Sequence, residues 1–386
     1  MGQVQKLEFY HLEIPYPRAL QSHLWRGSRQ HTHCVDILRV WTEDGLEGVA
    51  GVGAVGRERQ GQGALLERLL LGLRIDDLAG LSMRLREVMH WGCHLEWVEP
   101  VLWDLRGKRA GLPLYRLLAP EKGEVSEVSV YCSTLERQEA DTRLASMDAI
   151  FSGGYQALRL SLLHDIAEDV RLLQEIRRRY GEDFPLMLNV DQGYRAWGVE
   201  PPPPGWKLAV ALDYLAAVEP FRLEWIEDIA DTYAYDDLSV LRCESEVPIA
   251  GGQKNTGWHE FKIFFEKGSL DIYMPDATMA GGIETTAQVM DACFQRDLHF
   301  SPSPSPNGFS VQTNLHLYAA WPRKYLFAYP FEPEVLPPHI RDVGLQRPLI
   351  VQDGKLRVPQ EPGLGISLDL DQLERYGVCW HRAEID

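Results

Sequence analysis

Three apolar runs of the sequence each end in polar side chains, at intervals of about one βα unit. These runs are Leu186–Asp191, Trp225–Asp228 and Pro248–Gln253, and they place polar groups at Asn189, Asp191, Glu227 and Gln253. Parallel strands bring their carboxyl ends to one edge of a sheet, so we expect these side chains to lie close together. Amide oxygens can ligate a cation but carry no charge. The polar residues at the ends of these three runs therefore predict a polar pocket that carries little negative charge.

The elements that hold this pocket fall into two groups, and the first is an α+β domain over residues 1–124. Residue alternation predicts antiparallel strands at 4–14, 35–42 and 46–55, and helical periodicity follows at 65–73, 81–90 and 98–118. Between the first two strands, residues 15–33 are predicted to form a loop. It carries cationic and aromatic residues that include Arg18, Trp25, Arg26, Arg29 and His33.

From residue 125 the pattern changes to short apolar strands that alternate with amphipathic helices. The predicted strands are 128–132, 157–162, 186–190, 223–227, 248–251, 271–274, 298–301 and 325–329. Eight such units predict a closed barrel with its active face at the carboxyl ends of the strands. The fold class is therefore α/β, an N-terminal α+β capping domain plus a modified (β/α) TIM-type barrel over residues 125–339.

Composition limits the partners and the compartment. The net charge of -17 repels phosphate, so neither nucleic acid nor an anionic membrane is an expected partner. The six cysteines contain no Cys-x-x-Cys pair, which is typical of small buried residues in a reducing compartment. No apolar run approaches the length of a membrane span, and we expect a cytoplasmic protein.

Several segments, in the right order, resemble the mandelate racemase-like branch of the enolase superfamily over nearly the whole chain. They are Trp103–Lys108, Gly111–Tyr115, Asp276–Ile283, Asp353–Lys355 and Pro362–Gly365. The resemblance implies racemisation, epimerisation, dehydration or cycloisomerisation of a small carboxylate or acid sugar by Mg2+-assisted α-proton abstraction. It also implies a homo-oligomer, and a C-terminal segment, 340–386, that returns to the capping domain.

The same resemblance places the family's site residues on unusual side chains. Its three acidic Mg2+ ligands fall on Asn189, Glu227 and Gln253, and its Lys-x-Lys bases fall on Arg159 and Ser161. The family's histidine base falls on Ser303, and the aspartate that partners this histidine falls on Asp276. The acidic residue of the family's eighth strand falls on Ala328. Arginine cannot act as a base because its pKa is far too high.

The two lost carboxylates have a large expected effect on Mg2+ binding. Charges about 4 Å apart interact by roughly 4 kcal/mol at an effective dielectric constant of about 20. Losing two carboxylates should therefore weaken Mg2+ by a factor of at least ~10³. We expect Mg2+ to be weak or absent here, and the inherited reaction to be lost or strongly weakened.

Three alternatives follow for the pocket. Asp191, one step nearer the mouth than Asn189, can hold a displaced metal together with Glu227 and Gln253. An acid–base pair without metal can use Lys254 and a buried Asp276, although strand alternation predicts that Lys254 points away from the mouth. A binding protein without catalysis can hold a carboxylate through Arg contacts under the loop. That loop supplies Arg18, Trp25, Arg26 and Arg29.

Residues 51–56 match Gly-x-Gly-x-x-Gly, a dinucleotide-binding pattern. The following residues 57–61 are polar and broken by glycine, so no helix opens at the third glycine. We interpret the segment instead as a flexible loop over the barrel mouth.

Overall fold

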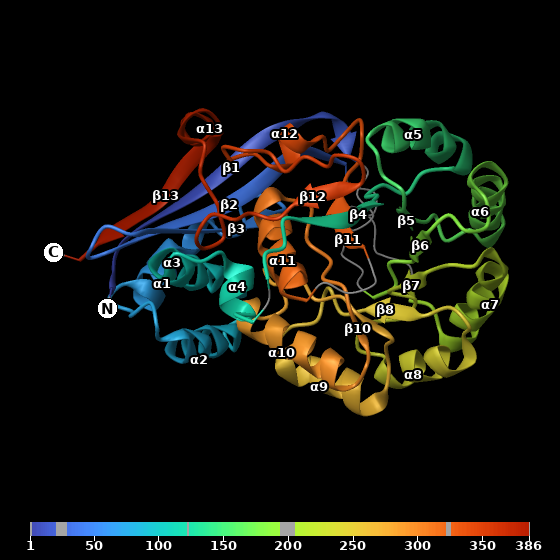
Figure 1. Cartoon of the computed structure of the whole chain (residues 1–386), viewed down its shortest axis with the longest axis horizontal. Coiled ribbons are helices and arrows are strands. Elements are labelled where there is room, and N and C mark those ends of the chain that lie inside the picture. Colours follow the sequence, from blue (N-terminus) through green and yellow to red (C-terminus); the bar gives the residue numbers. More distant parts are fainter. Residues whose placement is uncertain (1, 21–28, 122, 194–204, 322–325, 386) are drawn as a thin grey trace.

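The computed structural model of the chain describes residues 2–20, 29–121, 123–193, 205–321 and 326–385. Figure 1 shows an antiparallel sheet with helices on one side of the molecule and a ring of parallel strands enclosed by helices on the other. The fold prediction is therefore confirmed: an α+β capping domain stands on a modified (β/α) barrel. None of the described helices is both long and apolar enough to cross a membrane.

The capping domain is built on a four-stranded antiparallel sheet in the order β13-β1-β2-β3. Its strands are β1 (Val4–Leu20), β2 (Gln30–Thr42), β3 (Glu47–Ala54) and β13 (Gly377–Glu384). The prediction of a loop from residue 15 was wrong, because β1 and β2 stay paired beyond it. Ile14 lies opposite His33, and Pro15 lies opposite Thr32. Proline suggests a strand end, but here the partner strand extends the pairing.

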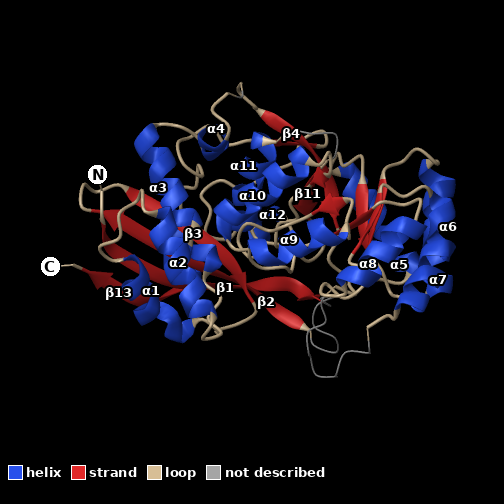
Figure 2. Cartoon of the chain, turned by 90° about the horizontal axis from the view of Figure 1, so that it is seen from below, coloured by secondary structure: helices blue, strands red, loops and turns tan. Residues whose placement is uncertain are grey.

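Helices cover one face of this sheet (Figure 2). They are the 3-10 turns η1 (Gln60–Gln62) and η2 (Glu96–Val98), and the helices α1 (Gly63–Leu70), α2 (Leu78–Met89) and α3 (Pro100–Ala110). The short helix α4 (Leu114–Leu118) follows α3 and buries Leu114 and Tyr115 in the core that includes the barrel. The odd-numbered residues of β1, such as Leu7 and Phe9, bury against Leu66 and Leu81 of these helices. The predicted helix 98–118 is divided by Gly111, which ends α3 with a φ of 67°, and by Pro113.

The barrel contains eight parallel strands in the order β10-β9-β8-β7-β6-β5-β4-β11. Among the described residues no strand pairing joins β10 to β11, so the sheet is curled and the predicted closure of the barrel is not confirmed. They are β4 (Glu127–Ser133), β5 (Leu158–Ser161), β6 (Leu186–Asn189), β7 (Trp225–Glu227), β8 (Ile249–Gly251), β9 (Ile272–Tyr273), β10 (His299–Phe300) and β11 (Phe327–Pro330). The helices between them are α5 (Ala140–Ser152), α6 (Ile166–Tyr180), α7 (Leu208–Val218), η3 (Glu219–Phe221), α8 (Tyr235–Glu244), α9 (Trp258–Lys267), α10 (Gly282–Gln295) and α11 (Gly308–Ala320).

The two domains meet along α11, whose residues are all buried. Gly51 of β3 lies directly on this helix, because a Cβ at that position would be 2.5 Å from the Phe309 ring. The glycine-rich segment is therefore part of a strand that packs closely on α11, and the expectation of a flexible loop was wrong for residues 51–54. Close backbone approach explains the glycine without a dinucleotide.

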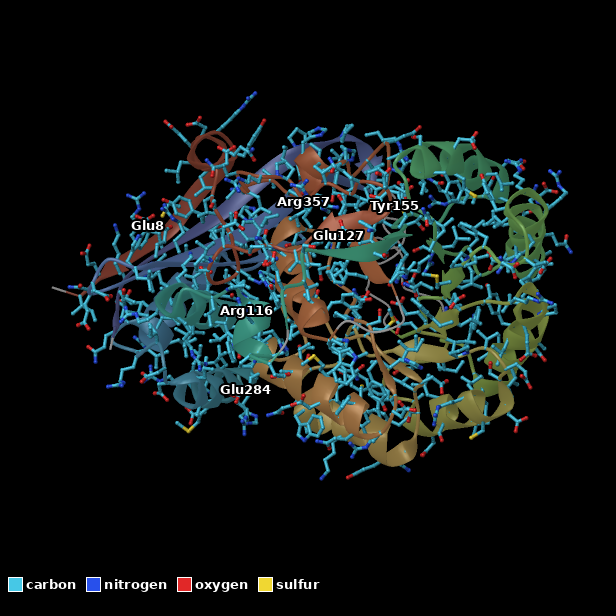
Figure 3. The ribbon with its side chains drawn as sticks, in the orientation of Figure 1. Glu8, Arg116, Glu127, Tyr155, Glu284 and Arg357 are labelled. Carbon is cyan, nitrogen blue, oxygen red and sulfur yellow. The ribbon has the colours of Figure 1, made fainter. Side chains whose placement is uncertain are left out.

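The C-terminal segment crosses from the barrel to the capping sheet. It contains α12 (Pro338–Arg341), β12 (Lys355–Arg357), α13 (Leu370–Tyr376) and β13. Strand β12 pairs with β4 of the barrel, where Arg357 lies opposite Glu127 (Figure 3). The buried Asp104 of α3 then accepts hydrogen bonds from the backbone N–H groups of Val49 and Leu364 at 2.9 and 2.8 Å. One carboxylate thus joins α3, β3 and the C-terminal segment.

Candidate functional site

The barrel interior is filled by a layer of apolar side chains that sets which residues face the mouth. This layer includes Tyr131, Ala157, Met187 and Trp225. Side chains of a strand alternate, so the residues two positions later face the same interior, one layer nearer the mouth. Those residues are Ser133, Arg159, Asn189 and Glu227. The structure thus places the predicted site positions Arg159, Asn189 and Glu227 on three neighbouring strands.

A buried ion pair occupies the centre of this layer. The Arg159 side chain is 4% exposed and Glu227 is fully buried. Arg159 Nε donates to Glu227 Oε2 at 2.7 Å, and Nη2 donates to Oε1 at 2.8 Å. Burial alone would lower the pKa of Arg159, but the Glu227 carboxylate raises it well above the usual range. Both oxygens of Glu227, a metal-ligand position by the sequence resemblance, are therefore held by a fixed cation.

Asn189 and Asp191 form two hydrogen bonds with each other. Asn189 Nδ2 donates to Asp191 Oδ1 at 2.9 Å, and the backbone N–H of Asp191 donates to Asn189 Oδ1 at 2.9 Å. Strand β6 ends at Asn189, and Asp191 has a left-handed φ of 49° that folds its side chain back. Arg137 Nη2 lies 3.6 Å from Asp191 Oδ2. The Asn189 amide is consequently engaged on both its nitrogen and its oxygen.

Gln253 and Lys254 both lie at the mouth. Lys254 Nζ donates to Gln253 Oε1 at 2.7 Å, and Gln253 Nε2 donates to the backbone oxygen of Ser303 at 2.8 Å. The expectation that Lys254 points away was wrong. Strand β8 ends at Gly251, and Gly252 has a φ of 103°, so the strand alternation has already stopped. Lys254 therefore brings an ammonium group to the cavity.

Asp276 lies below the mouth inside a closed set of hydrogen bonds. Its Oδ1 accepts from Thr278 and Asn314, its Oδ2 accepts from Ser305, and the Ser310 hydroxyl reaches both oxygens at 3.0 Å. These hydrogen bonds connect Asp276 to the loops after β9 and β10 and to α11. This geometry favours a structural role for Asp276, and the catalytic role expected from the sequence stays a prediction.

Replacing Asp276 with asparagine is expected to lower the free energy of unfolding by about 2–3 kcal/mol, because hydrogen bonds to a charged group are lost and the amide NH2 faces donors. Urea unfolding followed by circular dichroism measures this change. The exposed Asp148 of α5 offers a matched control, Asp148→Asn, with an effect within about 0.5 kcal/mol. Unchanged stability in Asp276→Asn would contradict the structural role.

A cavity of about 240 Å³ lies between the capping domain and the barrel mouth. The barrel contributes Ser133, Arg159, Gln253, Lys254 and Ser303, among others. The capping domain contributes residues that include Tyr16, Gln30, His33, Cys34, Gly53 and Arg59. Of the predicted site residues, the structure thus brings Arg159, Gln253, Lys254 and Ser303 together at one cavity.

The other predicted site residues do not line this cavity. Glu227 lies behind Arg159, and the Ser161 hydroxyl donates to the Thr134 backbone oxygen at 3.1 Å. Arg18 forms an ion pair with Glu136 at 2.7 Å and another with Glu334. Such pairs join β1 to the barrel and leave Arg18 a structural role in place of the expected ligand contact. Arg29 is exposed, and Trp25 and Arg26 lie outside the described residues. The strand-eight position, Ala328, is buried and carries no acid.

His33 and Tyr16 were missed as members of the site. Burial lowers the pKa of His33 to about 4, so its ring is neutral near pH 7. Its Nε2 lies 3.3 Å from the Arg341 backbone oxygen, which can only accept, so Nε2 carries the proton. The Nδ1 atom then accepts from the Tyr16 hydroxyl at 3.2 Å. Tyr16 and His33 reach the mouth because β1 and β2 remain paired beyond residue 15, and this pairing was not predicted from the sequence.

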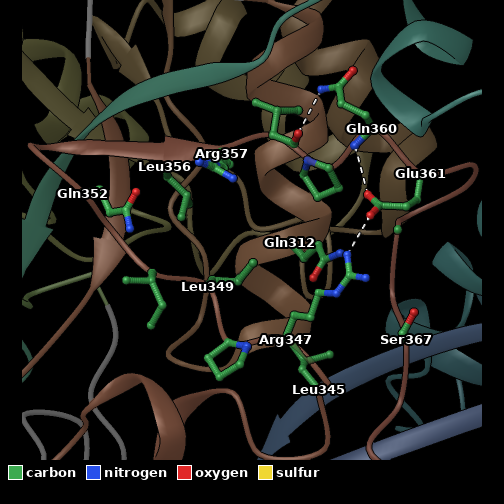
Figure 4. Close-up of a pocket in the computed structure, with 15 residues that line it drawn as sticks. Gln312, Leu345, Arg347, Leu349, Gln352, Leu356, Arg357, Gln360, Glu361 and Ser367 are labelled. Atoms are coloured by element: carbon green, nitrogen blue, oxygen red, sulfur yellow. Dashed lines mark hydrogen bonds and ion pairs between the residues drawn. The ribbon is translucent and has the colours of Figure 1, made fainter.

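A larger hollow of about 560 Å³ lies on the C-terminal segment, away from the predicted site residues (Figure 4). Its charged lining is partly self-neutralised, since Arg347 pairs with Glu361 at 3.0 Å. Gln312 Nε2 donates to the Leu364 backbone oxygen and so belongs to the packing of α11. We therefore place the candidate site at the smaller cavity, where both domains supply polar side chains.

The donor set at the mouth does not fit Mg2+ in this arrangement. Mg2+ requires several hard oxygen ligands in near-octahedral geometry. Arg159 occupies Glu227, the Asn189 oxygen accepts a backbone N–H, and the Gln253 oxygen accepts from Lys254. Among the described residues of the barrel domain, no three His, Cys, Asp or Glu ligand atoms gather within 4.8 Å. The Arg159 guanidinium and the Lys254 ammonium group thus bind oxygen atoms that a metal ion would need as ligands.

Family models match both domains. The model "Mandelate racemase / muconate lactonizing enzyme, N-terminal domain" matches residues 9–119, and "Enolase C-terminal domain-like" matches residues 143–372. The chain belongs to the enolase superfamily. Within the superfamily it is a mandelate racemase/muconate lactonizing enzyme-like member, as the sequence resemblance predicted.

Characterised relatives are enzymes of acid sugars. The chain is 26% identical over 353 residues to an L-talarate/galactarate dehydratase of Salmonella typhimurium, covering 88% of this chain and 81% of the relative. It is also 26% identical to a 3,6-anhydro-alpha-L-galactonate cycloisomerase of Streptomyces coelicolor, covering 88% of this chain and 91% of the relative. These relatives include both lyases and isomerases.

Solved structures share the fold. An L-talarate dehydratase from Polaromonas sp. JS666, complexed with Mg and L-glucarate, superimposes with a TM-score of 0.81 at 22% identity, covering 100% of this chain and 99% of that chain. A racemase from Streptomyces coelicolor with bound magnesium gives a TM-score of 0.80 at 23% identity, covering 97% and 100%. Magnesium is thus typical of this family's structures.

Proposed function

We propose that the cavity at the domain junction binds a small organic anion of the acid-sugar type, and that the Mg2+-dependent α-proton abstraction of the family is absent or strongly weakened in this chain. The observation that supports this most is the buried Arg159–Glu227 pair, with distances of 2.7 and 2.8 Å. A fixed guanidinium holds both oxygens of the single remaining family carboxylate. Mg2+ cannot use that carboxylate unless the pair breaks.

Lys254 is the residue best placed to bind a ligand carboxylate. It lines the cavity, and its Nζ contacts the neutral Gln253 amide at 2.7 Å. Among the described residues, no carboxylate lies within ion-pair distance of this ammonium group. Arg59, by contrast, is already paired with Asp36 and Glu58. Lys254 therefore retains unneutralised charge toward an incoming anion.

Polar groups around Lys254 suit the hydroxyl groups of a sugar acid. Ser133, Ser303 and Tyr16 present hydroxyls to the cavity, and the Gln253 amide lies between Lys254 and Ser303. A volume of about 240 Å³ suits a ligand smaller than most drug-sized molecules. The site chemistry and its size thus point to a compact polyhydroxy carboxylate.

Replacing Lys254 with methionine is expected to weaken the binding of galactarate or glucarate at least tenfold, because a charge-assisted hydrogen bond contributes about 1.5–3 kcal/mol. Isothermal titration with each acid sugar measures the effect. Lys262→Met on α9, where the lysine is exposed and paired with Glu266, should leave binding unchanged. If none of the acid sugars shifts the melting temperature of the unmodified protein, the proposal fails at its first step.

The alternative is an active isomerase or lyase. It would use either a displaced metal at Asp191, Glu227 and Gln253 or an acid–base pair without metal. One observation favours a mechanism without metal, although it concerns Asp228 and not the pair of Lys254 and Asp276 expected from the sequence. Asp228 follows Glu227 at the end of β7, and burial, together with the Glu227 charge, raises the pKa of Asp228 to about 7. A carboxyl that titrates near neutral pH suits general base catalysis.

Solvent-deuterium exchange into an acid sugar separates the two proposals. A catalytic Asp228 must be deprotonated, so exchange would rise with pH through about 7 and disappear in Asp228→Asn. Our proposal instead expects ligand binding without exchange from pH 5 to pH 9, with or without added Mg2+. Proton nuclear magnetic resonance of the α-carbon position records the outcome.

A further inference from the structure

A group of metal-binding side chains lies on the capping sheet, apart from the barrel strands. On β1 the sequence is His11-Leu12-Glu13, and on β2 it is Cys34-Val35-Asp36. The antiparallel register places His11 opposite Asp36 and Glu13 opposite Cys34. Because side chains alternate along a strand, these four residues share one face of the sheet. This is the face on which Leu7 and Phe9 bury, beyond the edge of the helices.

The potential ligand atoms on this face are already close together. The His11 ring nitrogen, the Cys34 sulfur and a Glu13 carboxylate oxygen lie within 4.8 Å of one another. His11 Nε2 lies 3.1 Å from Glu13 Oε1. Tetrahedral zinc with bonds of about 2.0–2.3 Å requires ligand separations of roughly 3.3–3.6 Å. The nitrogen–oxygen pair therefore has nearly the required separation, and the Cys34 sulfur lies within 4.8 Å of a His11 ring nitrogen and a Glu13 oxygen.

The surroundings of His11 match those of a metal-binding histidine. The buried Asp36 carboxylate lies 2.6 Å from His11 Nδ1, which leaves Nε2 directed toward Glu13. The His11 ring also stacks on Trp380 of β13, with centroids 4.3 Å apart and planes at 8°. A carboxylate on the far ring nitrogen fixes the orientation of metal-ligating histidines and raises their basicity. Arg59 in turn holds Asp36 at 3.0 Å.

We propose that His11, Glu13 and Cys34 bind one zinc ion, with water at the fourth position and Asp36 orienting the histidine. The mixed nitrogen, sulfur and oxygen donor set suits zinc and differs from the oxygen ligands that Mg2+ prefers. Binding releases to solvent the Cys34 thiol proton and any proton on His11 Nε2, so no redox step is involved.

Access to this site is available from solvent. Glu13 is 35% exposed, and its present partner Arg57 is 59% exposed, so Arg57 can leave Glu13 without unpacking the core. Cys34 is itself buried but lines the cavity at the barrel mouth. The zinc site and the candidate anion site are thus neighbours, although neither proposal depends on the other.

Zinc titration of the full chain, freed of metal by chelation, tests the proposal. We expect one zinc ion per chain, and with Co2+ as a probe we expect the near-ultraviolet absorption of a thiolate–cobalt bond. Cys34→Ser should abolish that absorption and weaken zinc at least tenfold, and Asp36→Asn should weaken it about 10–100-fold. Cys243→Ser, which removes an exposed cysteine of α8, should change neither measurement.

Two results would overturn the zinc proposal. One is zinc bound equally well by Cys34→Ser, which would place the ion elsewhere, for example at the barrel mouth. The other is absence of stoichiometric zinc in the unmodified chain, which would leave His11 as an imidazole held only by Asp36 and Glu13. Glu13→Gln, at a partly exposed position, gives a second variant if Cys34→Ser folds poorly. Circular dichroism before each titration verifies that the variant is folded.

Discussion

Replacing Glu227 with glutamine is expected to lower the free energy of unfolding by about 3–5 kcal/mol, the cost of leaving one member of a buried ion pair without its partner. Arg159 is 4% exposed and donates two of its hydrogen bonds to Glu227, so no water can take over this role. The amide of glutamine accepts only one of these bonds and carries no charge. Urea unfolding at neutral pH measures the difference.

Two further variants make this result specific. Glu168→Gln removes one partner of the exposed Arg171–Glu168 pair on α6 and should cost at most about 1 kcal/mol. Adding Arg159→Leu to Glu227→Gln should recover much of the loss, because the uncompensated buried charge is then gone. A cost below about 1 kcal/mol for Glu227→Gln alone would mean that Glu227 is hydrated and accessible to a cation, contrary to the structure.

The sequence was sufficient to predict the barrel and the strand ends that face its interior. The apolar runs ending at Asn189 and Glu227 are short, continuous and terminated by a polar residue, which is the pattern of strands buried on both faces. The pairing of Arg159 with Glu227 was not predicted. It depends on β5, β6 and β7 being neighbours, and on the Arg159 side chain reaching past β6. Such a contact is set by tertiary structure and leaves no local pattern.

Wrong expectations about single side chains have a common physical cause. The direction of Lys254 was inferred by continuing strand alternation past Gly252, where the chain takes a φ of 103°. The hydrogen-bond donors around Asp276, which include Ser305, Ser310 and Asn314, come from a later loop and helix, so the sequence did not predict them. Local periodicity does not contain these contacts. The residues at which prediction failed are therefore those where the strands end and the site begins.

The structure also changes how the loss of carboxylates is understood. By the resemblance, neutral amides stand at positions 189 and 253, and the cations of Arg159 and Lys254 lie close by. The Arg159 guanidinium binds both oxygens of Glu227 and balances its negative charge, as a bound metal ion would do. The mouth thereby keeps its structure without a divalent ion, and Lys254 remains available for an anionic ligand.

Restoring the metal ligands alone should therefore have little effect. Asn189→Asp with Gln253→Glu is expected to change Mg2+ affinity less than tenfold, because Arg159 still holds Glu227. Adding Arg159→Gln frees that carboxylate and removes a like charge. The triple variant should then bind Mg2+ roughly 10³-fold more tightly than the unmodified chain, from about 4 kcal/mol of recovered attraction.

Isothermal titration with Mg2+, and electron paramagnetic resonance with Mn2+ as its substitute, measure both steps. Arg177→Gln, at another buried arginine whose guanidinium donates only to backbone oxygens of the barrel loops, serves as the control and should not change Mg2+ affinity in the ligand-restored background. Tight binding by the double variant would show that the Arg159–Glu227 pair opens readily. Weak binding by the triple variant would mean that strands β6 and β8 do not present positions 189 and 253 to a common ion. The order in which affinity rises thus separates the effect of the neutral side chains at 189 and 253 from the effect of the Arg159 cation.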